Sequence, residues 1–219
     1  MKKPSESKKG VRGKRGTERE SIGALKREIA RLKTLVYKDS LTKLYNRLGF
    51  HEEAEKMFLV AKHTLDRPGV RRNFILDGFS IIFADLDHFK AVNDTYGHEA
   101  GDAALTHAAK VLKRSVRESD IVARLGGEEF VAALLGASET DAARVAEKAR
   151  ERLAAQPVVW KRRRIPITAS FGVAALKNGD TFEELVAHAD SAAYGAKRAG
   201  RNRVMVWSEV GEKRGVGEK

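Results

Sequence analysis

The sequence predicts an α+β fold in which helices pack on one mainly antiparallel β-sheet. Hydrophobic residues make up 42% of the 219 residues, which is enough to bury a core. Apolar runs of strand length are interspersed with amphipathic segments of helix length, and two short runs, 121–125 and 130–135, flank a Gly-Gly pair. A hairpin of this kind, combined with crossover helices, is typical of the α+β class.

The N-terminal region divides into two parts. Residues 1–20 contain eight Lys or Arg residues and three Glu residues without an apolar period, so we expect a basic disordered tail. Apolar residues then recur three and four apart from Ile22 to Val36, which predicts an amphipathic helix over residues 21–38. This stripe is consistent with a short coiled-coil seam and also with packing on the chain's own domain.

The remaining elements are expected within one domain over residues 39–207, followed by a disordered tail over residues 208–219. Thr181 and Gly200 are residue types that commonly begin and end a helix, and they bound the last helical segment. We predict helices over 46–65, 101–116, 140–155 and 181–198, a loop over 66–78, and strands over 78–85, 121–125, 130–135, 165–175 and 203–207.

Composition excludes several classes of protein. The absence of cysteine excludes disulfide scaffolds and thiolate sites. No apolar stretch approaches the roughly 18 residues of a membrane span, and no signal-peptide pattern is present, so we expect a cytoplasmic protein. The net charge of +12 fits binding to nucleic acid or an anionic membrane, but no aromatic residue interleaves the basic tail, which favours a solvated tail.

Two acidic clusters follow predicted strands. Asp85 and Asp87 come directly after an apolar strand, where hard oxygen ligands suit Mg²⁺ held together with substrate phosphates. Glu128 and Glu129 follow two glycines, and adjacent carboxylates repel each other unless a cation is near. A plain strand end and an exposed polar turn are the alternative interpretations, and neither cluster alone excludes them.

Five segments together resemble the GGDEF-domain diguanylate cyclases, in the glutamate variant of their signature. The signature is Gly126-Gly-Glu-Glu-Phe130. The other matching segments, in chain order, are DSLTKLYNR at 39–47, DLDHFKAVNDTYGHEAGD at 85–102, RESD at 117–120 and ADSAAYGAKRAGRNR at 189–203. The resemblance covers most of the chain and implies the family's palm-like, ferredoxin-related domain, preceded here by an N-terminal helix.

The resemblance also implies a role for individual residues. Glu128 and Glu129 would be catalytic, and Asp85, the Leu86 carbonyl and Glu128 would bind Mg²⁺, for which Mn²⁺ can substitute. Glu128 would also help to deprotonate the attacking hydroxyl. The substrate-binding residues would be Lys90, Asn93, His98, Asp102, Gly126, Gly127, Lys197 and Arg201. Lys197 and Arg201 are four residues apart, and we expect them to share the end of one helix face.

The implied reaction joins two GTP molecules into cyclic di-GMP and releases two pyrophosphates, in a homodimer because each domain would bind one GTP. Arg117 and Asp120 would form an inhibitory site for the product, with Arg144 as a candidate second cation. A non-catalytic receptor for GTP or cyclic di-GMP is the alternative, which the presence of all the acidic residues disfavours. No specific nucleic acid is expected as a partner.

Overall fold

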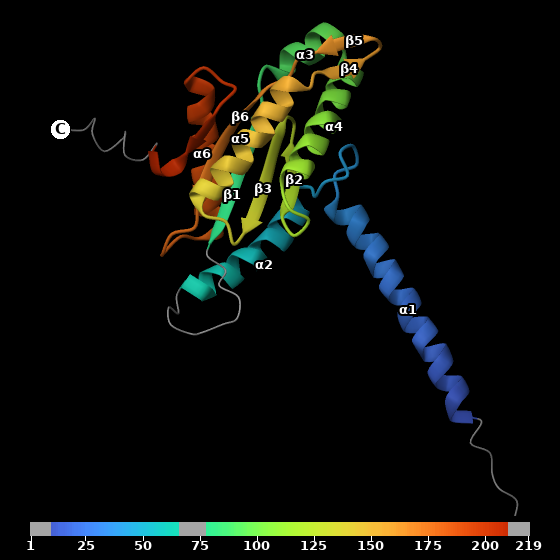
Figure 1. Ribbon diagram of the computed structural model, residues 1–219. Coiled ribbons are helices and arrows are strands. Elements are labelled where there is room, and N and C mark those ends of the chain that lie inside the picture. The colour runs from blue at the N-terminus through green and yellow to red at the C-terminus, as the bar shows by residue number, and fades with distance from the viewer. Residues whose placement is uncertain (1–9, 66–77, 210–219) are drawn as a thin grey trace, which may run out of the picture.

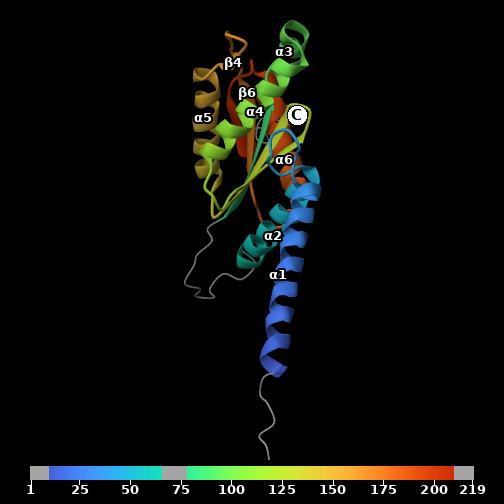
Figure 2. The ribbon, with the colours of Figure 1, turned by 90° about the vertical axis from the view of Figure 1, so that its right-hand side faces the viewer.

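The computed structural model describes residues 10–65 and 78–209. Helix α1 (Gly10–Tyr37) projects away from the rest of the molecule, and α2 (Arg47–Leu65) turns back to pack on the sheet (Figures 1 and 2). The helix begins before Ser21, so the tail expected over residues 1–20 is helical from Gly10 onward. Lys, Arg and Glu are good helix formers, and they extend the helix from its apolar part. Residues 1–9 lie outside the described part.

One five-stranded sheet forms the centre of the domain, in the order β2-β3-β1-β6-β7. All neighbouring strands are antiparallel except β6 and β7, which are parallel. The prediction of a mainly antiparallel α+β sheet is therefore confirmed. The strands are β1 (Phe79–Leu86), β2 (Ile121–Gly126), β3 (Glu129–Leu135), β6 (Ala169–Ala175) and β7 (Val204–Val206).

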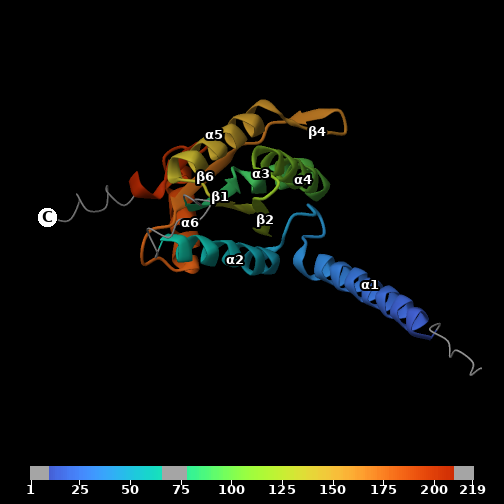
Figure 3. The ribbon, with the colours of Figure 1, turned by 60° about the horizontal axis from the view of Figure 1, so that its bottom comes forward.

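Helices cover both faces of the sheet (Figure 3). Helices α4 (His98–Ser115) and α5 (Glu139–Ala155) lie on one face, and α2 and α6 (Phe182–Arg198) lie on the other. Successive side chains of a strand alternate between faces, so β1 contributes Ile82 to the first core and Ile81 to the second. Strand β1 is buried along its whole length, and its carboxyl end lies next to the turn between β2 and β3.

Two short elements depart from the predicted order. Helix α3 (Phe89–Tyr96) lies in a polar segment for which no helix was predicted. The strand predicted over residues 165–175 is divided, because β5 (Arg163–Ile165) pairs with β4 (Val158–Trp160) in a separate hairpin. Pro166 follows β5 directly and cannot donate to a strand ladder, which explains the break before β6.

Of the predicted loop over 66–78, only Gly78 lies within the described residues, and residues 210–219 lie outside them. Helix α6 begins after a capping box formed by Thr181 and Glu184, which confirms the prediction that Thr181 caps this helix. In the parts of the chain that the structure describes, no helix is long and apolar enough to cross a membrane.

Candidate active site

The carboxyl end of β1 and the turn between β2 and β3 meet at one edge of the sheet (Figure 1). Asp85 lies opposite Glu129 in the β1–β3 ladder, and the Leu86 amide donates a hydrogen bond to the Glu128 carbonyl at 3.3 Å. The two acidic clusters identified in the sequence are therefore neighbours in space.

Asp85 is a buried carboxylate of this edge, with 8% of its surface exposed. One oxygen, Oδ2, lies 2.5 Å from the Lys197 ammonium. The other, Oδ1, is buried without a hydrogen-bond partner among the described residues. Burial raises the pKa of Asp85, Lys197 opposes this shift, and the negative charges of Glu128 and Glu129 add to it.

This environment fits a divalent cation. A buried, unpartnered carboxylate oxygen beside two further negative charges is costly unless a positive charge approaches it. Within the described residues, no three Asp, Glu, His or Cys side chains are gathered so as to hold an ion by themselves. Asp85 and the neighbouring Glu128 offer carboxylate oxygens, the kind of donor that Mg²⁺ takes together with substrate phosphates.

Close packing of α6 on β6 brings Lys197 to this edge. A Cβ atom on Gly172 would lie 2.0 Å from the Ala189 carbonyl oxygen, so only glycine allows the helix to approach so near. The expectation that Lys197 and Arg201 share a helix face is wrong, because α6 ends at Arg198. Arg201 instead has a left-handed backbone with a φ of 63°, and its amide donates to the Ala196 carbonyl.

The glycines of the hairpin tip are required by its backbone. Gly126 and Gly127 have φ values of 153° and 48°, and a Cβ atom on either would meet nothing within 4 Å. The tip is therefore open to an approaching ligand. Arg124 fixes the backbone of the tip, because its guanidinium donates two hydrogen bonds to the Gly127 carbonyl oxygen, at 2.8 and 3.0 Å.

Arg124 also links the hairpin tip to the turn that follows α1, a contact that sequence analysis missed. Its Nη1 lies 3.4 Å from the carboxylate of Asp39, which in turn accepts hydrogen bonds from the amide and hydroxyl of Thr42. Burial acts to raise the pKa of Asp39, but the hydrogen bonds from Thr42 and the charge of Arg124 outweigh it and hold that pKa below its usual value. The sequence signal for this contact is that Asp39 belongs to one matching segment, 39–47, and that Arg124 lies beside another, Gly126–Phe130.

Glu129 faces a different neighbour from Glu128. Its carboxylate lies 4.0 Å from the Arg47 guanidinium, and both residues line a cavity of about 470 Å³ against Phe50 and Phe182. Glu129 still acts on Asp85 through its charge. Its direct partner in the structure is therefore a cation of α2.

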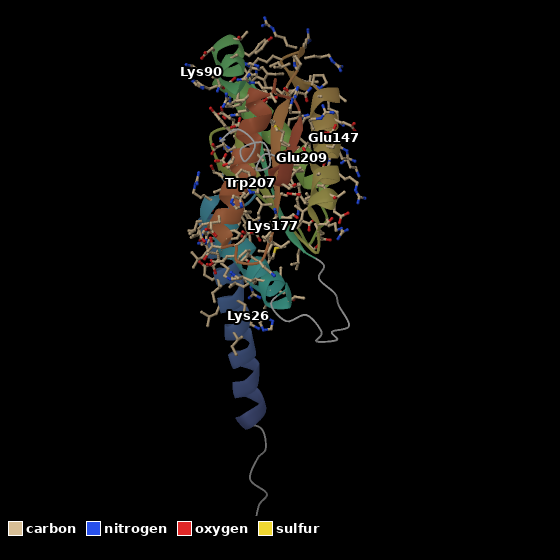
Figure 4. The ribbon with its side chains drawn as sticks, turned by 90° about the vertical axis from the view of Figure 1, so that its left-hand side faces the viewer. Lys26, Lys90, Glu147, Lys177, Trp207 and Glu209 are labelled. Carbon is tan, nitrogen blue, oxygen red and sulfur yellow. The ribbon has the colours of Figure 1, made fainter. Side chains whose placement is uncertain are left out.

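The residues expected to bind guanine come from α3 and α4. A Cβ atom on Gly101 would lie 1.9 Å from Asn93 Oδ1, so glycine admits the Asn93 side chain against α4 directly beside Asp102. Asp102, His98 and Lys90 are exposed, and Lys90 lies at the end of the domain away from α1 (Figure 4). Asp102 also lines a cavity of about 760 Å³ together with Trp160 of β4.

Arg117 and Asp120 lie before β2, at the edge of the sheet opposite to Asp85 (Figure 1). Asp120 is 5% exposed, and its Oδ2 accepts a hydrogen bond from the Arg117 amide at 2.8 Å. Burial raises the pKa of Asp120, against the opposing effect of Arg117.

A cavity of about 290 Å³ adjoins these residues, and the cations in its lining are Arg114, Arg117 and Lys148. Arg144 is not among the residues that line it. Its guanidinium pairs with Asp141 at 2.8 Å instead, so the expectation that Arg144 supplies the second cation is not supported.

The chain is similar in sequence to known proteins. The model of the family described as "Diguanylate cyclase, GGDEF domain" matches residues 36–203. The chain belongs to the GGDEF-domain family. It is 39% identical over 183 residues to the bifunctional diguanylate cyclase/cyclic di-GMP phosphodiesterase MucR of Pseudomonas aeruginosa, covering 83% of this chain and 24% of that protein. It is 34% identical over 170 residues to the probable diguanylate cyclase DgcF of Escherichia coli, covering 75% and 50%.

Solved GGDEF domains share the fold. The coiled coil and GGDEF domain of DgcB from Caulobacter crescentus, in complex with c-di-GMP, matches with a TM-score of 0.75 and 25% identity, covering 90% of this chain and all of that one. The active GGEEF domain of a Vibrio cholerae diguanylate cyclase matches with a TM-score of 0.64 and 31% identity, covering 74% and 96%. The chain spans between about a quarter and a half of the curated relatives MucR and DgcF.

Proposed function

We propose that this protein is a Mg²⁺-dependent diguanylate cyclase that condenses two GTP molecules into cyclic di-GMP and releases two pyrophosphates. The observation that carries the proposal is the unpartnered Oδ1 of Asp85, buried at the strand end beside the Gly126–Glu129 tip. The family membership supports the same reaction, since curated relatives carry this activity in their names.

Each residue of the edge has a task in this reaction. Asp85, the Leu86 carbonyl and Glu128 would hold Mg²⁺, which when bound neutralises phosphate charge and lowers the pKa of the attacking 3′-hydroxyl. Glu128 would also accept the proton of that hydroxyl. Lys197 would move from Asp85 to a phosphate oxygen as the substrate enters, because an ammonium binds phosphate as a point charge.

The guanine base would be selected on the side of α3 and α4. The Asp102 carboxylate would accept hydrogen bonds from the guanine N1–H and exocyclic amine, a pattern that adenine does not offer. Asn93 would contact the base from α3, and His98 lies between these two residues in the substrate segment. Lys90 and Arg201 would add positive charge for the triphosphate.

The test is incubation of the purified chain with GTP and Mg²⁺, followed by chromatographic separation of the nucleotides. We expect cyclic di-GMP and pyrophosphate with GTP, no cyclic dinucleotide with ATP, and no turnover after chelation of the metal. Saturable binding of GTP or cyclic di-GMP without any turnover would instead establish the non-catalytic receptor.

We further propose that turnover requires two subunits, because the product contains two guanosines and each domain would bind one GTP. Helix α1 supplies an apolar stripe that the described part of the chain leaves uncovered, with Leu25 61%, Ile29 53% and Leu32 47% exposed. This helix projects from the domain, so two copies could pair without obstructing their catalytic edges (Figure 2). Pairing would raise the local concentration of the two half-sites.

A charge in the stripe tests this pairing. The double variant Leu25→Glu, Ile29→Glu should show specific activity that falls more steeply on dilution than that of the wild type, with a matching fall in mass by light scattering. Arg27→Glu is the matched control, because at 100° per residue Arg27 lies on the face of α1 opposite to the stripe. Identical dilution profiles for the double variant and the wild type would show that α1 does not pair the subunits.

The cavity beside Arg117 would bind cyclic di-GMP as an inhibitor. The guanidiniums of Arg114 and Arg117 and the ammonium of Lys148 provide charge for its two phosphates. Asp120 holds the Arg117 backbone, so its first task in this site would be to fix the position of Arg117.

A further inference from the structure

The second aspartate of the Asp85-Leu86-Asp87 segment has a different environment from the first. Asp87 is 5% exposed, yet neither of its carboxylate oxygens is left buried without a partner. Its Oδ1 accepts a hydrogen bond from the Ser170 hydroxyl at 2.7 Å, and its Oδ2 accepts one from the Thr168 hydroxyl at 2.7 Å. Its own amide donates to the Thr168 carbonyl at 2.8 Å, so Asp87 is locked onto the start of β6.

The third donor to this carboxylate comes from beyond α6. The backbone amide of Asn202 donates to Asp87 Oδ2 at 3.0 Å. Arg201 and Asn202 have φ values of 63° and 44°, a left-handed conformation that residues other than glycine rarely adopt in succession. Such a backbone persists only where its surroundings hold it, and Asp87 is the buried group that does so.

A second anchor holds the same turn from the other side. The Arg150 guanidinium of α5 donates to Asn202 Oδ1 at 3.0 Å, and Arg150 is itself paired with Glu147 at 2.6 Å. Asn202 therefore joins the end of β1 to α5. The backbone position of the residue before it, Arg201, follows from these contacts.

Arg201 itself has an exposed side chain, and no carboxylate among the described residues pairs with it. The neighbouring cation of the closing segment, Lys197, is already at the catalytic edge on Asp85. A free guanidinium held next to that edge by a buried carboxylate is suited to a planar, doubly hydrogen-bonded contact with phosphate.

We propose that Asp87 is a positioning residue that holds the left-handed turn at Arg201 and Asn202, and so presents Arg201 to the substrate triphosphate. Asp87 then takes no part in metal binding, although it lies two residues from Asp85 in a segment that invites a two-aspartate metal site. This inference rests on the proposed function, because it assigns the ligand of Arg201 as the triphosphate of GTP.

The test is a double-mutant cycle between Asp87→Ala and Arg201→Ala, with kcat and KM measured for GTP. Each single variant should raise KM about 10-fold, the loss expected for one charge-assisted contact to phosphate, and should change kcat less. In the Arg201→Ala background, Asp87→Ala should raise KM little further, because the residue through which it acts is already gone. The Mg²⁺ concentration for half-maximal rate should stay that of the wild type.

Additional variants distinguish positioning from a general loss of structure. Asp87→Asn retains one acceptor oxygen and should recover part of the affinity, and Arg150→Gln should raise KM in the same direction but by less. Glu151→Gln removes an exposed carboxylate of α5 and should behave as the wild type. Should Asp87→Ala fail to fold, Asp87→Asn takes its place in the cycle with Arg201→Ala.

Two outcomes would overturn the proposal. Independent, multiplicative effects of Asp87 and Arg201 on KM would show that Asp87 does not act through Arg201. A large shift in the Mg²⁺ requirement of Asp87→Asn would make Asp87 a metal ligand. Absence of cyclic di-GMP from the wild type would count against the proposed function alone, and the cycle would then be run on the Kd of a non-hydrolysable GTP analogue.

Discussion

Asp85 and Asp120 are buried aspartates at opposite ends of the sheet, and burial raises the pKa of both. They differ in how their oxygens are satisfied. Asp120 accepts a hydrogen bond from the Arg117 amide, and neither of its oxygens is buried without a partner. Asp85 has Lys197 on one oxygen and, among the described residues, nothing on the other.

This difference separates a carboxylate that shapes the backbone from one that awaits a ligand. Burial and a raised pKa are common to both and therefore do not identify a catalytic group. The unpartnered oxygen of Asp85 points to a bound ligand, because a buried acceptor without a donor is costly and persists where a ligand supplies the missing partner. Asp87 fits the same rule, since it is buried and saturated by three donors.

The largest expected effect is at the unsatisfied end. Asp85→Asn and Glu128→Gln should each lower kcat about 10³-fold, because each removes a negative charge that a metal ion requires, worth several kcal/mol in the transition state. Thermal unfolding should show that both variants fold. Steady-state rates at saturating Mg²⁺ are the measurement, and retention of most of the wild-type rate there would show that the metal assignment is wrong.

The fold could be predicted from the sequence where the pattern was long and periodic. The apolar run before Asp85 predicted β1, and the paired runs around Gly126-Gly127 predicted β2 and β3, because buried strand residues form short continuous apolar runs. Helix α3 was missed because half of its eight residues are polar and it buries only Phe89 and Val92.

The site was predictable as a set of residues but not as a set of contacts. Sequence spacing suggested that Lys197 and Arg201 share a helix face, whereas the helix stops between them and a left-handed turn carries Arg201. The partners of that turn, Asp87 and Arg150, are distant in the chain. The contact of Arg124 with Asp39 is equally non-local, and no local pattern encodes such pairs.

A smaller effect is expected on base selection at the catalytic end. Asp102→Ala should lower the preference for GTP over ATP by about 1.5–3 kcal/mol, roughly 10- to 100-fold in the ratio of kcat/KM values, because it removes a charged acceptor for guanine. Competition between the two nucleotides in one reaction measures this ratio directly. An unchanged ratio would show that Asp102 does not read the base.

At the end of the sheet opposite to Asp85, Arg117→Ala tests whether the residues held by Asp120 form a regulatory site. The concentration of added cyclic di-GMP that halves the initial rate should rise about 10-fold, because one guanidinium contact to the product is lost. Arg144→Ala is the matched control, since Arg144 pairs with Asp141 and does not line the cavity. Equal sensitivity of Arg117→Ala and the wild type to cyclic di-GMP would exclude Arg117 from a product site.

The smallest expected effect is on stability, and it sharpens the contrast between the two aspartates. The pKa of Asp120 is raised in the folded protein, so the folded state favours the protonated form of this side chain. This preference stabilises the fold at low pH. The stabilisation is lost as the pH rises from about 4, the pKa of an unfolded aspartate, through the raised pKa of the folded state. Asp120→Asn cannot titrate, and its carbonyl oxygen can still accept the hydrogen bond from the Arg117 amide. The Tm of the variant relative to the wild type should therefore be higher at pH 7 than at pH 4, by less than about 4 °C, which corresponds to roughly 1 kcal/mol in a domain of this size.

Calorimetry at the two pH values measures the difference. A relative Tm that is lower at pH 7 than at pH 4 would mean that the charged form of Asp120 stabilises the fold, and that its contacts with Arg117 and Lys113 outweigh its burial.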